Sequence, residues 1–240
     1  MIRDNYFDAI VSTLGKIRES QGEKLTRAAE AVSEVILKGG IIYIFGCGHS
    51  HLIALDCFYR AGGLANVSAM LDTDLMLHNG AAKSSKMEKM SGIAEAVLDR
   101  YCLTEKDLLF TVSTSGKNAV PTEMAEAASK RGIKNIAIVS SAYFEDKKDK
   151  PLLYEHAGMY IDNCVPKGDA VIEVTGAGTK MGSLSTAASS YILQTVLAEG
   201  AEIAGRSGAR LPVYMSGNVE GGTEYNAELI AEYMPRIKHL

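Results

Sequence analysis

The amino-acid sequence predicts an α/β fold in which helices wrap a parallel β-sheet. Short apolar, β-branched runs, at residues 41–45 and 136–139, are typical of strands that are buried on both faces. Segments with apolar residues at helical spacing separate these runs along the chain. Alternation of such strands with helices is the pattern of a parallel sheet that carries helices on its faces.

The N-terminal half begins with two expected helices. Residues 3–38 place apolar side chains at helical spacing, and Gln21-Gly22 divides them. The next expected elements are a strand at 41–45, a helix at 51–60 that ends at Gly62-Gly63, and a strand around 67–71. Residues 72–91 are polar and rich in lysine, which predicts a long loop with a helical portion.

The C-terminal half continues the alternation, with helices expected at 92–100 and 119–131 and strands at 108–113, 135–140, 159–161 and 170–174. Residues 143–150 are charged and predict a solvated loop. A helix at 183–204 is apolar on most faces, which predicts burial or an interface. Because no linker is present, we expect one domain over residues 1–240, with an N-terminal helical segment at about 1–38 and a C-terminal extension at about 206–240.

The composition is that of an ordinary globular protein. Hydrophobic residues make up 47% and charged residues 22%, and a net charge of −4 without any basic run argues against a nucleic-acid surface. The apolar stretches are too short to span a bilayer, and the N-terminus lacks the apolar core of a secretory signal. The four cysteines show no CxxC spacing. They therefore predict reduced thiols in a cytoplasmic protein, rather than a zinc site or a disulfide scaffold.

Two polar turns follow predicted strands. The turn TVSTSGKN at 111–118 precedes a predicted helix, and FGCGHS at 45–50 precedes another. Hydroxyls, a turn glycine and the free N–H groups of a helix start suit the oxygens of a phosphate. One such cluster is often only a helix cap. Two of them at the carboxyl edge of a parallel sheet, where ligands bind, favour an anion site.

Counting residues argues against two familiar phosphate motifs. A P-loop needs a glycine at the position of Thr111 and a hydroxyl at the position of Asn118. A dinucleotide fingerprint that starts at Gly46 and Gly48 needs a third glycine where the chain has His51. The imidazole would crowd the helix–strand packing that glycine permits, so a nicotinamide cofactor is disfavoured, and no cofactor is expected.

The two turns together resemble those of the SIS (sugar isomerase) domains. FGCGHS is similar to the GCGTS turn of that family, and STSGKN at 113–118 is similar to its S-x-S-G-x-[TN] phosphosugar turn. SGNVEGGTEYN at 216–226 resembles a single-domain branch akin to phosphoheptose isomerase-like proteins. The resemblance implies a three-layer, flavodoxin-like, doubly wound fold with a five-stranded parallel sheet. It also implies a homodimer or a homotetramer.

By position, the resemblance implies that both turns bind the phosphosugar. Ser113, Ser115 and Asn118 would hold the phosphate, and Ser50 would face the sugar. Asn118 stands where threonine is commoner, and its amide still donates a hydrogen bond. The full set of expected binding residues is Gly48, His49, Ser50, His51, Ser113, Thr114, Ser115, Gly116 and Asn118.

Aldose–ketose isomerisation needs a base that moves a proton between C1 and C2, and an acid that opens the ring. His78, in LMLHNGAA, resembles the first histidine of a loop in arabinose-5-phosphate isomerases of the SIS superfamily, and the second histidine of that loop is absent. Glu199 lies in an apolar helix, where a carboxylate is costly to bury unless it is paired or functional. His78 and Glu199 are therefore the predicted catalytic residues. A surface histidine, and a solvent-facing Glu199 beside Glu202, are the alternatives, and Glu88 is expected to be a solvated charge.

Phosphoheptose isomerases in the same family ligate zinc through a histidine and a glutamate on the helix after the first turn. In this sequence Asp56 and Arg60 stand at those positions, and an arginine cannot ligate zinc. We therefore expect no metal.

The resemblance implies a phosphosugar-binding protein, and an aldose–ketose isomerase that acts through an enediol(ate) is the leading hypothesis. The alternatives are a phosphosugar etherase or lyase, and a non-catalytic phosphosugar-binding regulator. The expected partners are a small sugar phosphate and further copies of the chain, without nucleic acid or membrane.

Overall fold

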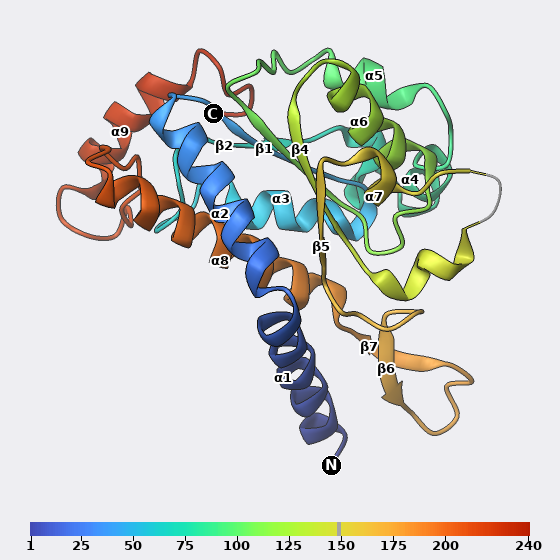
Figure 1. Cartoon of the computed structure of the whole chain (residues 1–240). Helices are drawn as coiled ribbons and strands as arrows, with labels where there is room; N and C mark the ends of the chain where they lie inside the picture. The colour runs from blue at the N-terminus through green and yellow to red at the C-terminus, as the bar shows by residue number, and fades with distance from the viewer. Residues whose placement is uncertain (148–149) are drawn as a thin grey trace.

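The computed structural model describes residues 1–147 and 150–240, and within them five parallel strands form one sheet in the order β2-β1-β3-β4-β5 (Figure 1). The strands are β1 (Ile42–Gly46), β2 (Val67–Met70), β3 (Leu108–Val112), β4 (Lys134–Val139) and β5 (Met159–Asp162). The predicted fold class is confirmed, because helices cover both faces of this sheet. The strand order reverses between β1 and β3, which makes that boundary the topological switch point.

Alternate residues of β1 show the two covered faces. Ile42 and Ile44 pack with α2 (Gly22–Leu37) and α8 (Ser185–Arg206). Tyr43 and Phe45 pack with α5 (Ile93–Leu98) and α6 (Ala119–Lys130) on the other face. Such burial on both faces requires the continuous apolar run that marks this strand in the sequence. The helices are α1 (Ile2–Ser20), α2 (Gly22–Leu37), α3 (His51–Cys57), α4 (Ala81–Met87), α5 (Ile93–Leu98), α6 (Ala119–Lys130), α7 (Leu153–His156) and α8 (Ser185–Arg206).

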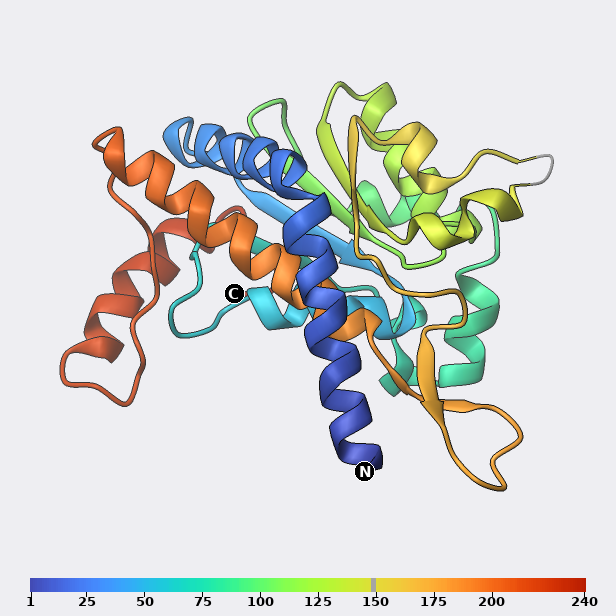
Figure 2. The same cartoon turned by 60° about the horizontal axis from the view of Figure 1, so that its bottom comes forward.

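The helical break at Gln21-Gly22 is confirmed, since α1 and α2 meet there. The N-terminal half of α1 projects away from the sheet (Figures 1 and 2). Of the charged segment 143–150, residues up to Asp146 belong to the 3₁₀ helix η4 (Ser141–Asp146), which corrects the prediction of a loop there. Residues 148–149 of that prediction lie outside the described part of the chain.

The predicted strand at 170–174 exists, but it lies outside the parallel sheet. It forms β6 (Ala170–Glu173), which pairs antiparallel with β7 (Lys180–Ser183). This hairpin lies beside α1, where the Tyr6 hydroxyl donates a hydrogen bond to the carbonyl of Ser183 at 2.7 Å (Figure 2). The hairpin therefore supports the projecting helix rather than extending the sheet.

The C-terminal extension contains a further helix, α9 (Gly222–Tyr233). Leu229 of this helix packs with Tyr214 and Ala65, and Ile237 enters the core beneath α5 and α6. The extension is therefore part of the packed structure. No helix in the described part of the chain is long and apolar enough to cross a membrane.

Candidate functional site

The two polar turns meet at the switch point of the sheet. Gly46, the last residue of β1, lies opposite Val112, the last residue of β3. The chain leaves β1 through the 3₁₀ helix η1 (Gly48–Ser50) into α3, and it leaves β3 through residues 113–118 into α6. Because parallel strands end at the same edge, both turns border one crevice.

The second turn is braced from within. The hydroxyl of Ser113 accepts a hydrogen bond from the N–H of Gly116 at 3.3 Å. Gly116 has φ +60°, a left-handed conformation that disfavours a side chain, and its carbonyl accepts the N–H of Leu153 at 2.9 Å. The contact with Leu153 fixes the turn on α7, and the N–H of Ser113 fixes it on β4 by donating to the carbonyl of Ile138 at 3.0 Å.

Donors of this turn remain open. Asn118 has an extended backbone at the start of α6, and its side chain does not cap the helix. Among the described residues, no acceptor is found for the N–H groups of Ser115, Lys117 and Ala119, or for the Ser115 hydroxyl. The turn therefore offers several donors to one place at a helix N-terminus, which is the arrangement that binds an anion.

The first turn depends on close packing at Gly46. A Cβ at this position would lie 2.6 Å from the carbonyl carbon of Ser50 and 2.8 Å from its Cβ. Ser50 therefore packs directly against the end of β1, and its N–H donates to the carbonyl of Cys47 at 3.0 Å. This glycine places Ser50 at the crevice.

Two imidazoles lie beside the first turn. His51 is only 3% exposed, and its Nδ1 contacts the carbonyl oxygen of Gly48. A carbonyl only accepts, so Nδ1 carries the proton and Nε2 of the neutral ring is the acceptor. His78, in the 3₁₀ helix η3 (Leu77–Asn79), lies edge-on to His51 with 6.0 Å between the ring centroids. The structure thus brings His78 next to the turn.

The start of α8 closes the crevice from a third side, and no motif in the sequence predicts this wall. The hydroxyls of Ser185, Thr186 and Ser189 line it opposite Ser50 and Thr114. The other lining residues are His49, Ile53 and Val112. The volume of this part of the crevice is about 10 Å³, at the lower limit of what one water molecule needs. Binding a sugar there requires the surrounding side chains to rotate or the start of α8 to shift.

A buried asparagine connects these walls. Asn163 follows β5 and is 0% exposed, and its Nδ2 lies 3.4 Å from Thr114 Oγ1 and 3.4 Å from Ser189 Oγ. Its Oδ1 accepts the N–H of Val165 at 3.2 Å. The available signal in the sequence was a polar residue directly after a strand, the same signal that marked the two turns.

Glu88, expected to be a solvated charge, is half-buried at the end of α4. Its carbonyl accepts the N–H of Val120 in the first turn of α6 at 3.0 Å. Burial raises the pKa of its carboxyl group, while the amide of Asn118 and the charge of Lys89 act in the opposite direction. Burial raises the pKa of Cys47, which precedes η1, and the nearby charge of Glu88 raises it further. The carboxyl group therefore lies between the two turns.

Glu199 is not brought to this crevice. It lies fourteen residues beyond Ser185 on the same helix, which corresponds to about 20 Å along the axis. Its side chain is partly exposed on the far half of α8. Within one chain, Glu199 cannot contact a ligand held by the two turns.

Asp56 and Arg60, at the positions of the zinc ligands, form an ion pair. Burial acts to raise the pKa of Asp56, but hydrogen bonds from Gln194 at 3.0 Å and Ser190 at 2.7 Å, together with Arg60, outweigh it and lower the pKa. Residues 1–147 and 150–240 contain no cluster of three or more metal-ligating side chains. Asp56 instead joins α3 to α8.

Comparison with known proteins identifies the family. The model of the SIS domain matches residues 5–140. A UPF0309 protein of Geobacillus thermodenitrificans is 41% identical over 238 residues, which cover 98% of this chain and 96% of that protein. A UPF0309 protein of Caldanaerobacter subterraneus is 39% identical over 244 residues and covers 99% of each chain.

Solved structures share the fold at low identity. A phosphoheptose isomerase from Francisella tularensis superimposes with a TM-score of 0.54 at 14% identity, over 82% of this chain and 95% of that chain. The NanR protein of Vibrio vulnificus in complex with ManNAc-6P gives a TM-score of 0.52 at 15% identity, over 100% of this chain and 71% of that chain. The chain therefore belongs to the SIS domain family, and within it to the UPF0309 proteins.

Proposed function

We propose that the crevice at the switch point binds a sugar phosphate. The observation that carries this proposal is the convergence of open N–H and hydroxyl donors of residues 113–118 at the start of α6. A dianionic phosphate satisfies such donors better than a neutral group, because charge-assisted hydrogen bonds are the stronger ones. Ser113, Ser115 and Asn118 then hold the phosphate.

The sugar extends from the phosphate toward the first turn. Ser50 and Thr114 face the hydroxyls of Ser185 and Ser189 there, and hydroxyl groups that both donate and accept match a polyol. His49 lines the same place, and His51 follows Ser50 at the start of α3. Gly48 and Gly116 are also expected to contribute to binding, through the backbone conformation of the turns. Thr114 is expected to contribute through its own polar atoms.

The reaction we propose is aldose–ketose isomerisation through an enediol(ate). Glu88 is suited to move the proton between C1 and C2, because a half-buried carboxyl group with a raised pKa is a stronger base than an exposed one. His78 and His51 are suited to open the ring. Glu199 remains a predicted catalytic residue, and this role would require that Glu199 of one chain contacts a ligand bound by another chain. The fold is shared by a phosphoheptose isomerase and by the NanR protein that was solved in complex with ManNAc-6P, so the reaction needs its own test.

We also propose a homodimer or homotetramer in the cytoplasm. Leu52 and Leu55 are exposed on α3, and Tyr59 is exposed just beyond its C-terminal end, which is consistent with a subunit contact there. Sedimentation at working concentration tests this, and a monodisperse monomer contradicts it.

The binding proposal is tested by calorimetry and thermal shift with paired ligands, such as glucose 6-phosphate and glucose, fructose 6-phosphate and fructose. Phosphate esters are expected to bind and free sugars are not. Ser115→Ala is expected to weaken binding about tenfold, equivalent to about 1.4 kcal/mol, without loss of thermal stability. Ser207→Ala, at the distant end of α8, is the control. Equal binding by both variants would contradict the assignment of the turn.

The isomerase proposal is tested separately, by proton exchange at C2 of a bound ester in D₂O. Exchange and conversion support isomerisation. Binding without exchange indicates a regulator, and elimination of a substituent indicates a lyase.

A further inference from the structure

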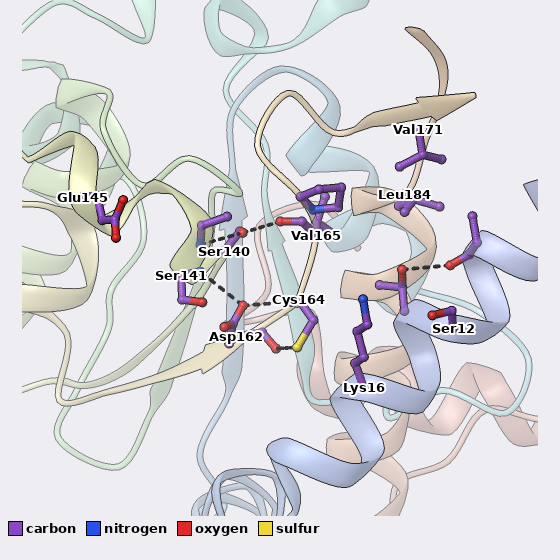
Figure 3. Close-up of a pocket in the computed structure, with 14 residues that line it drawn as sticks. Ser12, Lys16, Ser140, Ser141, Glu145, Asp162, Cys164, Val165, Val171 and Leu184 are labelled. Atoms are coloured by element: carbon purple, nitrogen blue, oxygen red, sulfur yellow. Dashed lines mark hydrogen bonds between the residues drawn. The ribbon is translucent and has the colours of Figure 1, made fainter. Parts of the chain in front are cut away.

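A second cavity lies apart from the crevice, between α1 and the carboxyl ends of β4 and β5 (Figure 3). Its volume is about 660 Å³, within the range of pockets that hold small molecules. It shares no lining residue with the crevice between the two turns. One wall is apolar and includes Val165, Pro166, Val171 and Leu184.

The other walls carry opposite charges. Lys16 extends from α1 into the cavity beside Cys164, and it has no ion-pair partner among the residues that the structure describes (Figure 3). Asp162 stands across from it at the end of β5, with Glu145 of η4 further out. A single charged ligand would therefore meet repulsion from one wall.

The Asp162 carboxylate is held in a fixed orientation. Its Oδ1 accepts the N–H of Cys164 at 2.8 Å and the N–H of Ser141 at 3.2 Å. Within the described chain, Oδ2 has no hydrogen-bond partner. One oxygen is thus used to shape the loop, and the other is left for a ligand. The hydroxyls of Ser12 and Ser141 also line the cavity.

We propose that this cavity is a second small-molecule site, which binds an amino-acid-like zwitterion with its carboxylate at Lys16 and its ammonium group at Asp162. The apolar wall then covers the carbon skeleton of the ligand. An anion alone would face Asp162 and Glu145, and a cation alone would face Lys16. The site does not depend on the proposed isomerase activity.

The cavity wall is joined to the phosphate turn by hydrogen bonds. The N–H of Ser140 donates to the carbonyl of Thr114 at 2.9 Å, and the Ser140 hydroxyl donates to the carbonyl of Val165. Asn163, between Asp162 and Cys164, contacts the Thr114 hydroxyl. A ligand that fixes these residues also restrains Thr114. Occupancy of the cavity is therefore expected to change affinity for a phosphate ester, and the reverse effect must be equal.

The test uses the full chain and the twenty common L-amino acids, added singly in thermal shift and calorimetry. Gluconate provides a carboxylate without an ammonium group, and glucosamine provides an ammonium group without a carboxylate. At least one amino acid is expected to bind, and neither single-charge probe is. Lys16→Gln and Asp162→Asn are each expected to weaken that binding at least tenfold. The amide of the second variant keeps an oxygen that accepts both N–H groups.

Arg18→Gln is the matched control, because it removes a cation from the same helix outside the cavity lining. Failure of every amino acid to bind overturns the proposal, as does binding that Lys16→Gln leaves unchanged. Binding of gluconate alone overturns the assigned ligand class. These outcomes are read without any sugar phosphate, so they are independent of the proposed function. Titrating glucose 6-phosphate with and without the bound amino acid then tests the coupling between the cavity and the crevice. An unchanged affinity for glucose 6-phosphate contradicts that coupling.

Discussion

The side-chain amide of Asn163 lies 3.4 Å from the hydroxyl oxygen of Thr114. The same amide lies 3.4 Å from Ser189 Oγ, so one buried group joins the end of β5, the phosphate turn and the start of α8. Its carbonyl oxygen is occupied by the N–H of Val165. The shape of the crevice therefore depends on a residue that follows a strand outside the two turns.

Asn163→Asp tests this role. The carboxylate keeps the acceptor for Val165 but loses both donors and buries a negative charge, so we expect unfolding free energy to fall by about 2 kcal/mol or more at neutral pH. Burial raises the pKa of such a carboxyl group, so the loss is expected to shrink as the pH falls and the group is protonated. Urea unfolding at pH 5 and pH 8 measures this. Asn218→Asp, at an exposed position, is the control, and equal losses in both variants would contradict the role.

Gly46→Ala tests the packing of the first turn. The added Cβ would lie within 2.6 Å of the backbone of Ser50, so the turn must move away from β1. We expect a loss of about 1–3 kcal/mol in unfolding free energy and weaker binding of phosphate esters. Gly217→Ala is the control, because its Cβ would meet nothing within 4 Å. Unchanged binding in Gly46→Ala would show that Ser50 is not placed by this contact.

Arg236→Gln tests the docking of the C-terminal segment. The side chain of Asp107 is 0% exposed, and it accepts hydrogen bonds from Arg236 Nη2 at 2.8 and 2.9 Å and from the N–H of Ile41 at 2.7 Å. Removing the guanidinium leaves this carboxylate without its ion-pair partner, with an expected loss of about 3 kcal/mol. Arg210→Gln breaks an exposed pair with Glu232 and is expected to cost less than about 1 kcal/mol. Equal midpoints for the two variants in denaturant would contradict this account.

The sheet was readable from the sequence because its strands are buried on both faces. β1 and β4 contain continuous apolar runs, whereas a helix that buries one face needs apolar residues only at helical spacing. The hairpin β6–β7 and α9 were harder, because their stability comes from packing against α1 and Tyr214 rather than from a local pattern. The run at 170–174 has strand propensity, but strand propensity does not predict which other strand it pairs with.

The site was predictable only where function has a local signature. The turns at 46–50 and 113–118 each combine a strand end, glycine and hydroxyls within a few residues. Asn163 carries only a weak local signal, a polar residue directly after a strand, and Ser189, inside α8, carries none, because both reach the crevice through tertiary contacts. Glu88 lies in a lysine-rich segment whose sequence predicts exposure to solvent. It is half-buried only because α4 packs on the start of α6.

Glu88→Gln tests the proposed base. The amide has the same shape but cannot take a proton, so we expect turnover to fall at least a hundredfold while ester binding remains. In the wild type, the acidic limb of kcat/KM is expected above the ordinary pKa of glutamate, because burial raises the pKa of Glu88.

Since that pKa is higher in the folded than in the unfolded chain, the carboxylate opposes folding increasingly as the pH rises through it. Unfolding free energy should therefore shift in favour of the variant between pH 4 and pH 8, whereas Glu95→Gln, at an exposed position on α5, should show no such trend. Unchanged turnover removes Glu88 from the reaction, and a stability difference that does not vary with pH shows that its carboxyl group is not buried.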